Sequence, residues 1–161
     1  MKTTQLEVAL SGYLDFRRNL IVPNVTYIKS VLEFEVDLLC VTNAGYASGY
    51  ELKVSRSDLR ADFKKSRHKA GGHWNPYRSL KHFYYVVRRE DEDIALDLVP
   101  EKFGVITFHT YDSHGVNLIG FNHVRKASLL SNYKWTTEQM LALGKLAAMR
   151  IPSLKARIIE Q

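Results

Sequence analysis

Hydrophobic positions near the start of the chain recur with the spacing of a helix that has one face in a protein core. They lie at i, i+3, i+4, i+7 and i+8, and they are Leu6, Ala9, Leu10, Tyr13 and Leu14. Thr4 followed by Glu7 is the pattern of a capping box and marks the predicted start of the helix. Arg17-Arg18-Asn19 marks its predicted end, because cations and asparagine favour helix C-termini.

Strand patterns follow this helix. We expect a short strand within Leu20–Ile28, where Pro23 restricts it to a sheet edge or a strand start because proline cannot donate to a ladder. Phe34–Thr42 and Tyr46–Val54 are rich in β-forming residues, and the three residues between them end in glycine. This arrangement predicts a hairpin with a three-residue loop and a left-handed Gly45.

The remaining pattern predicts two helices and three strands. One helix is expected over Ser55–Lys69, with Ser55 or Ser57 as its N-cap and the glycines at 71–72 as its end. The expected strands are His82–Val87, Gly104–Thr110 and Val116–Val124, with a turn at 112–115.

A last helix is expected to begin at Thr136 or Thr137 and to end where Pro152 breaks it. Met140, Leu143 and Ala147 would face inward. The chain has 161 residues and no linker or repeat. The order of elements therefore predicts a single α/β (α+β) domain over residues 1–161, with a central mixed β-sheet flanked by helices.

Composition narrows the class of protein. The chain is 45% hydrophobic and 25% charged, which excludes disordered and collagen-like classes. No apolar run reaches the roughly 18 residues that span a bilayer, and the first residues show no signal-peptide pattern. Cys40 is the single cysteine, which fits a reducing compartment and an inert core thiol. We therefore expect a cytoplasmic protein with no membrane partner.

Basic residues concentrate in one segment. The chain carries a net charge of +6, and residues 53–81 hold nine basic against two acidic residues, a local charge of +7. Such a concentration is typical of a surface that binds a polyanion such as DNA. A solvated helix without a partner is the alternative that the charge alone leaves open.

Part of this segment has the spacing of a phosphate-binding surface. Four cations at i, i+4, i+8 and i+11 share one stripe of the predicted helix, and they are Arg56, Arg60, Lys64 and Arg67. Beyond the helix, Lys69, Trp74 and Arg78 could follow a nucleic-acid backbone and stack on bases. Packing of Trp74 against the core is the open alternative.

The predicted hairpin brings acidic side chains together. Pairing across its three-residue loop places Asp37 directly opposite Glu51. The same register places Glu35 opposite Lys53. Opposed Cβ atoms lie about 5 Å apart, and like charges there destabilise a sheet unless a cation lies between them. Oxygen ligands with open positions suit Mg²⁺ or Mn²⁺; a cross-strand ion-pair ladder is the alternative interpretation.

Lys53 shares a strand face with Glu51 and would point to the same place. A lysine there can position a water, assist its deprotonation or neutralise charge on a phosphate. A divalent ion would lower the pKa of the attacking water. Two carboxylates and a lysine, followed by a basic helix, are therefore a pattern suited to phosphodiester cleavage.

Glu35-Val-Asp37 and Gly49-Tyr-Glu51-Leu-Lys53 resemble the core of the PD-(D/E)XK nuclease superfamily. The resemblance covers about residues 5–90 and implies a restriction-endonuclease-like fold. It implies that Asp37, Glu51 and Lys53 are catalytic. It also implies that Asp37, Glu51 and the backbone carbonyl of Leu52 hold Mg²⁺ or Mn²⁺.

The resemblance extends to residues around this core. Glu7 is a candidate additional metal ligand from the first helix, with the capping role as the simpler alternative. Glu35, Ser55 and Asp58 are expected to support the site. The continuation Glu-x-Lys-x-Ser-x-x-Asp, with Asp62 and Lys65 further on, is similar to bacterial MmcB-like DNA-repair proteins.

These observations favour a Mg²⁺-dependent nuclease that hydrolyses DNA phosphodiester bonds in repair, recombination or a mobile element. The alternative is a nucleic-acid-binding module that keeps the nuclease fold without cleaving. A protein-interaction subunit whose basic face meets an acidic partner is the third class. Mg²⁺-dependent cleavage separates the first from the second, and salt-dependent DNA binding separates both from the third.

Overall fold

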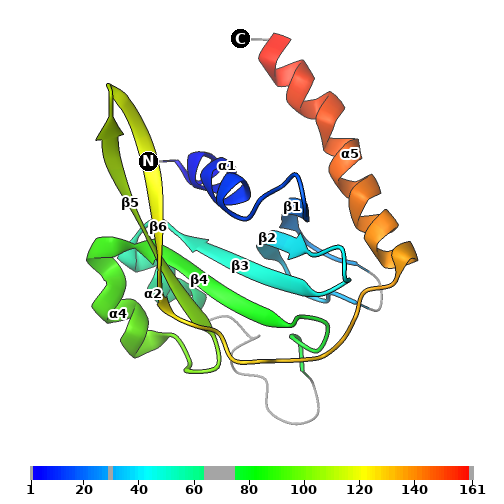
Figure 1. Ribbon diagram of the computed structural model, residues 1–161, viewed down its shortest axis with the longest axis horizontal. Helices are drawn as coiled ribbons and strands as arrows, with labels where there is room; N and C mark the ends of the chain where they lie inside the picture. The colour runs from blue at the N-terminus through cyan, green and yellow to red at the C-terminus, as the bar shows by residue number, and fades with distance from the viewer. Residues whose placement is uncertain (1, 29–30, 64–74, 160–161) are drawn as a thin grey trace.

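The chain is built around a six-stranded mixed sheet, seen in a computed structural model that describes residues 2–28, 31–63 and 75–159 (Figure 1). The strands are β1 (Leu20–Val25), β2 (Val36–Val41), β3 (Ala47–Lys53), β4 (His82–Arg88), β5 (Gly104–Ser113) and β6 (Val116–Arg125). They lie in sequence order; β3, β4 and β5 are parallel, and the other neighbours are antiparallel. The predicted α/β domain with a central mixed sheet is confirmed.

The hairpin of β2 and β3 has the predicted register. Leu38 pairs with Tyr50 and Val41 with Ala47. The backbone of Gly45 has a φ of +83°, and a Cβ there would lie 2.8 Å from the Trp135 carbonyl oxygen. Glycine is therefore required both by the left-handed turn and by the close approach of a distant chain segment.

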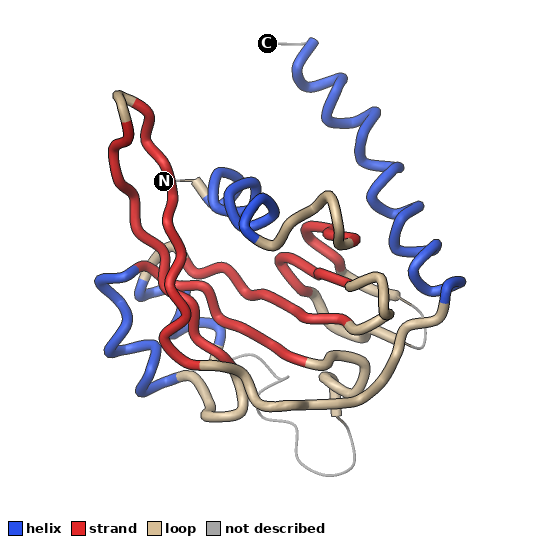
Figure 2. Tube along the Cα trace, in the orientation of Figure 1, coloured by secondary structure: helices blue, strands red, loops and turns tan. Residues whose placement is uncertain are grey.

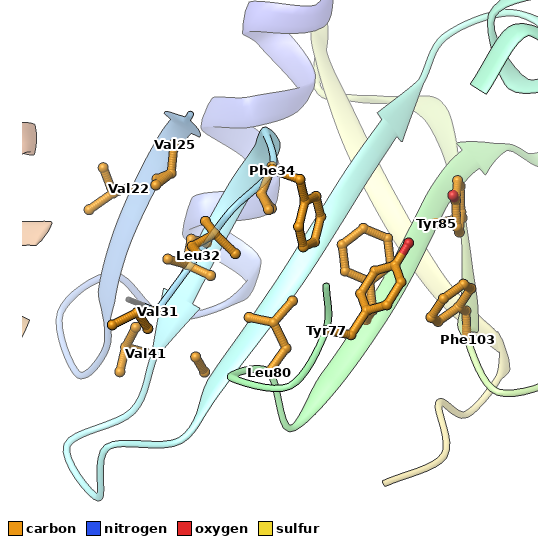
Figure 3. Packing of buried hydrophobic residues seen from close by; sticks show 14 of the residues in the cluster. Val22, Val25, Val31, Leu32, Phe34, Val41, Tyr77, Leu80, Tyr85 and Phe103 are labelled. Atoms are coloured by element: carbon orange, nitrogen blue, oxygen red, sulfur yellow. The ribbon is translucent and has the colours of Figure 1, made fainter. Parts of the chain in front are cut away.

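Two helical crossovers make the parallel part of the sheet. The helix α2 (Arg56–Asp62) lies between β3 and β4, while a 3-10 turn (Arg89–Asp91) and α4 (Glu92–Leu98) lie between β4 and β5. Leu59 of α2 and Ala95 of α4 belong to one large buried cluster with Phe83 and Tyr85 of β4. Both helices therefore cover the same face of the sheet, whose packing is shown in part in Figure 3.

The opposite face is covered by α1 (Thr3–Tyr13). Its Leu6 and Leu10 pack in a second buried cluster with Tyr50 and Leu52 of β3. Because side chains alternate along a strand, Glu51 and Lys53 point to the face that carries α2. Burial on both faces explains why β3 contains almost no exposed residue.

The first helix differs from its prediction at both ends. It begins at Thr3 because the Gln5 side-chain oxygen accepts the backbone N–H of Lys2 at 2.9 Å, in place of a Thr4–Glu7 box. It ends at Tyr13, before the basic pair, because Asp15 adopts a positive φ of 57° and turns the chain.

The last helix, α5 (Thr137–Ile159), confirms the predicted start and contradicts the predicted end. Thr136 and Gln139 form a capping box: the Gln139 N–H donates to Thr136 Oγ1 at 3.3 Å, and the Thr136 N–H donates to Gln139 Oε1 at 2.9 Å. The helix continues through Pro152, which is exposed. Water can therefore satisfy the carbonyl that this proline leaves without an N–H partner.

Two features at the periphery complete the fold. Figure 2 shows the β5–β6 hairpin extending beyond the other strands and α5 leading away from the sheet.

Within the described ranges, no helix is both long enough and apolar enough to cross a membrane.

Candidate functional site

A pocket of about 250 Å³ lies at the carboxyl end of β3, where β2 and the first residues of α1 and α2 meet. Its lining consists of Thr3, Glu35, Asp37, Glu51, Leu52, Lys53 and Asp58. The lining thus holds four carboxylates and one ammonium group, a formal charge of −3 in a chain whose net charge is +6. The sequence predicts six of these residues at one site, all except Thr3, and the fold brings them to one place.

The facing carboxylates of the hairpin are held by groups of the chain itself. Asp37 Oδ2 accepts the backbone N–H of Leu52 at 2.7 Å. Glu51, which is 2% exposed, accepts the Lys53 ammonium at 2.8 Å through Oε1. The repulsion expected between Asp37 and Glu51 is therefore reduced by a backbone donor and by a lysine.

Lys53 is the buried centre of a carboxylate cluster and is only 4% exposed. Its Nζ lies 2.8 Å from Glu51 Oε1, 3.3 Å from Asp62 Oδ1 and 3.9 Å from Asp58 Oδ1. The ladder interpretation anticipated a lysine–carboxylate contact, but these partners lie on Lys53's own strand and on α2. Glu35 lies at the exposed edge of the pocket, before β2 begins.

The environment of Lys53 keeps its ammonium group charged. Burial by itself lowers the pKa of this group, but the charge and hydrogen bond of Glu51, followed by the charges of Asp62 and Asp58, outweigh it. The pKa of Lys53 is therefore raised above its ordinary value of 10.5. A lysine in this state supplies positive charge to the pocket and does not act as a proton acceptor near neutral pH.

Asp62 is the site residue that sequence analysis did not assign to a role. It is 1% exposed, and its Oδ2 accepts the phenol hydroxyl of Tyr85 at 2.8 Å. The available signal was its spacing, since Asp58 and Asp62 lie four residues apart and share one face of the helix that follows Lys53.

Other predicted support residues have clear local roles. Ser55, one of the two predicted candidates, is the N-cap of α2, and its Oγ accepts the Asp58 N–H at 3.2 Å. The Glu7 carboxylate accepts the side-chain amide of Asn24 at 3.3 Å and does not line the pocket; Thr3 is the α1 residue that does.

The predicted DNA-binding residues are divided among three situations. Arg56 binds Asp91 and the Glu90 carbonyl, and so joins α2 to the segment after β4. Arg60 is exposed to solvent. Arg78 pairs with Glu33 at 2.5 Å. The other four residues, Lys64, Arg67, Lys69 and Trp74, lie outside the described residues.

The donor set at the pocket fits a metal that needs few protein ligands. Among the residues that the structure describes, no group of three or more His, Cys, Asp or Glu side chains is arranged to hold an ion. Magnesium commonly uses one or two carboxylates and completes its shell with water and substrate phosphate. Asp37 and Glu51, with the Leu52 backbone beside them, fit that demand.

A second and larger pocket lies away from this chemistry. It measures about 640 Å³ and is formed by α1 and the β5–β6 hairpin, with a lining of Thr4, Gln5, Val8, Ala9, Thr110, Asn117, Leu118 and Ile119. None of these lining residues is charged. The smaller pocket is therefore the candidate site, because it holds the ionisable groups.

The fold and the pocket define an α/β domain with an acidic site at the carboxyl end of a central strand. No family model and no curated protein matches the chain. A solved structure described as "SPO1766 protein of unknown function from Silicibacter pomeroyi" is similar, with 17% sequence identity and a TM-score of 0.55. The match covers 95% of this chain and 87% of that one, and it supports the fold alone.

Proposed function

We propose that this protein is a metal-dependent nuclease that hydrolyses DNA phosphodiester bonds with Mg²⁺ or Mn²⁺ at Asp37 and Glu51. The observation that carries the proposal is a pocket of formal charge −3 in a basic chain, with Lys53 in its wall. Such a pocket attracts a divalent cation, while the net positive charge of the chain attracts the phosphates of the substrate.

The residues of the pocket would have different roles in the reaction. Asp37 and Glu51 would hold the ion, which would activate water and offset charge on the phosphate. Lys53 would stay protonated and face the phosphate oxygens, where a fixed cation stabilises developing negative charge. The Leu52 N–H holds Asp37 by one oxygen, which orients the carboxylate in the absence of an ion.

Support for DNA as the substrate comes from the charge of the sequence segment 53–81, whose first residue, Lys53, lines the pocket. The segment that begins at Lys53 carries +7, and Arg60 on α2 is exposed to solvent. Phosphate binding by such a surface is steeply weakened by salt.

Calorimetry with Mn²⁺, followed by cleavage of labelled duplex and single-stranded DNA in Mg²⁺ or Mn²⁺, tests the proposal. The parent should bind Mn²⁺ and cleave, while Asp37→Asn and Glu51→Gln should lose both activities and keep the fold by circular dichroism. Asp97→Asn, at an exposed carboxylate of α4, is the matched control and should behave as the parent. Cleavage that persists in Glu51→Gln would contradict the proposal, and DNA binding without cleavage in the parent would favour the non-cleaving module.

A further inference from the structure

A buried chain of polar groups runs behind the acidic pocket. The Tyr85 hydroxyl donates to Asp62, the other Asp62 oxygen lies 3.3 Å from the Lys53 ammonium, and that ammonium donates to Glu51. All four side chains are almost fully buried. They come from β3, the last residue of α2 and β4.

We propose that Asp62 is a positioning residue that holds Lys53 in the pocket wall when Glu51 is engaged by a divalent ion, and that Tyr85 fixes Asp62. The inference rests on the proposed function of the pocket. Glu51 is the nearest carboxylate to Lys53 and also a proposed metal ligand, so an ion at Glu51 competes with the lysine for it. Lys53 then needs a second anchor to keep its direction.

Asp62 is better placed for that task than the other neighbour of Lys53. The Asp62 side chain is fully buried and lies 3.3 Å from Lys53 Nζ, while Asp58 lies 3.9 Å away with its side chain 47% exposed. Charges interact more strongly when water is excluded. Asp62 is absent from the residues that line the pocket, so its contact with Lys53 lies behind the wall.

The packing around Asp62 keeps its carboxylate in place. Tyr85 is the register partner of Glu51 on the neighbouring parallel strand. The ring of Phe63, the C-cap residue of α2, stacks on the Tyr85 ring with centroids 5.3 Å apart. The end of α2 is therefore attached to β4 by a stacked pair and a hydrogen bond, which fixes Asp62 between Tyr85 and Lys53.

Steady-state cleavage kinetics test this role with Asp62→Asn, the milder Tyr85→Phe and, for comparison, Asp58→Asn at the more distant carboxylate; Asp97→Asn is again the control. Asp62→Asn should lower kcat by about 10- to 100-fold while KM and the Mn²⁺ Kd stay within about twofold, because the lost interaction acts at the reacting phosphate. Tyr85→Phe should lower kcat less, and Asp58→Asn least. A rise in KM or in the Mn²⁺ Kd with kcat unchanged would overturn the proposal.

A double variant separates positioning from general damage to the fold. If Asp62 acts through Lys53, Lys53→Ala/Asp62→Asn should cleave no more slowly than Lys53→Ala alone. Independent, multiplicative losses would show that Asp62 acts elsewhere and would overturn the proposal.

A readout without cleavage uses the ¹⁵Nζ resonance of Lys53 with and without Mg²⁺. The parent should keep a protected ammonium signal when Mg²⁺ is added, and Asp62→Asn should lose it to solvent exchange only with Mg²⁺. Identical signals in both proteins at saturating Mg²⁺ would overturn the role of Asp62. A parent that binds Mg²⁺ but cleaves no DNA would overturn the proposed function, and the Lys53 signal would still decide the positioning role.

Discussion

Lys53 is the residue on which the stability of the candidate site most depends. It is the cation for two buried carboxylates, Glu51 and Asp62. Removing one partner of a buried ion pair costs about 3–5 kcal/mol because the remaining charges lose their compensation. The metal-free site is thus held together by the same residue that would act on the substrate.

We expect Lys53→Met to lower the free energy of unfolding in EDTA by about 3–5 kcal/mol. Because the uncompensated carboxylates attract a cation, Mn²⁺ or Ca²⁺ should bind this variant at least as tightly as the parent and restore part of the stability. Urea unfolding with and without the ion measures both effects. A loss below about 1 kcal/mol that ions do not change would contradict this account of the cluster.

A second prediction concerns the effect of Cys40 on how the free energy of unfolding depends on pH. Burial raises the pKa of its thiol from 9.0 to about 11. A group that keeps its proton longer when folded makes the folded state lose stability as the pH rises above 9, until the loss levels off above about 11. From pH 8 to pH 10 the parent should lose about 1.4 kcal/mol more than Cys40→Ala. Equal losses in urea unfolding of the two proteins would show that the folded thiol titrates normally.

At the scale of elements, α2 has separate structural and exposed sides. Arg56 and Arg88 both bind Asp91, which is 1% exposed, and Arg56 thereby attaches α2 to the segment after β4. Arg60, one turn later, is exposed. The predicted basic stripe therefore begins with a residue that is already engaged by the protein.

We expect Arg56→Gln to lower the stability of the fold and Arg60→Gln to weaken DNA binding. Arg56→Gln should lower stability by about 1–3 kcal/mol, because buried Asp91 loses one of its cations. Arg60→Gln should leave stability within about 0.5 kcal/mol and lower the slope of log K against log salt by about 0.9 for duplex DNA. Thermal unfolding and anisotropy titrations in Ca²⁺ measure the two effects. An unchanged slope in Arg60→Gln would place the DNA surface elsewhere.

The elements that sequence predicted well are those whose signals are local. The β2–β3 register follows from alternation and from Gly45, so Asp37 and Glu51 could be placed in one pocket before the structure was known. Each helix cap could be narrowed to two candidates, which include Ser55 and Thr136, because a cap and its partner lie three residues apart.

The contacts that the sequence did not predict depend on how distant elements dock. The contact between Lys53 and Asp62 requires α2 to pack across β3 and β4, and the Tyr85 hydroxyl joins it because the β3–β4 register places Tyr85 opposite Glu51. The pairing of Arg56 with Asp91 spans 35 residues. Spacing alone cannot predict such contacts. It places Asp58 and Asp62 on one helix face, but their distances to Lys53 depend on how two packed elements approach each other.

At the scale of the whole molecule, two hydrophobic clusters hold the sheet between its helices, and the acidic pocket lies at the edge of this core. We therefore expect the fold to form without a bound ion. We expect EDTA to leave the circular dichroism spectrum unchanged, while Mg²⁺ at 100 times its Kd adds about 2.7 kcal/mol by mass action. Loss of secondary structure in EDTA would show that the fold depends on the ion.

The edge strand β1 has a consequence for self-association. An edge strand exposes backbone groups that can recruit another chain, and proline is one natural defence. Pro23 removes one donor from this strand, and Arg150 of α5 donates to the Pro23 and Asn24 carbonyls. These contacts occupy two backbone acceptors of β1, so we expect the last helix to hinder intermolecular β-pairing at this edge. A chain cut before this helix should form amyloid-type aggregates far more readily than the full chain.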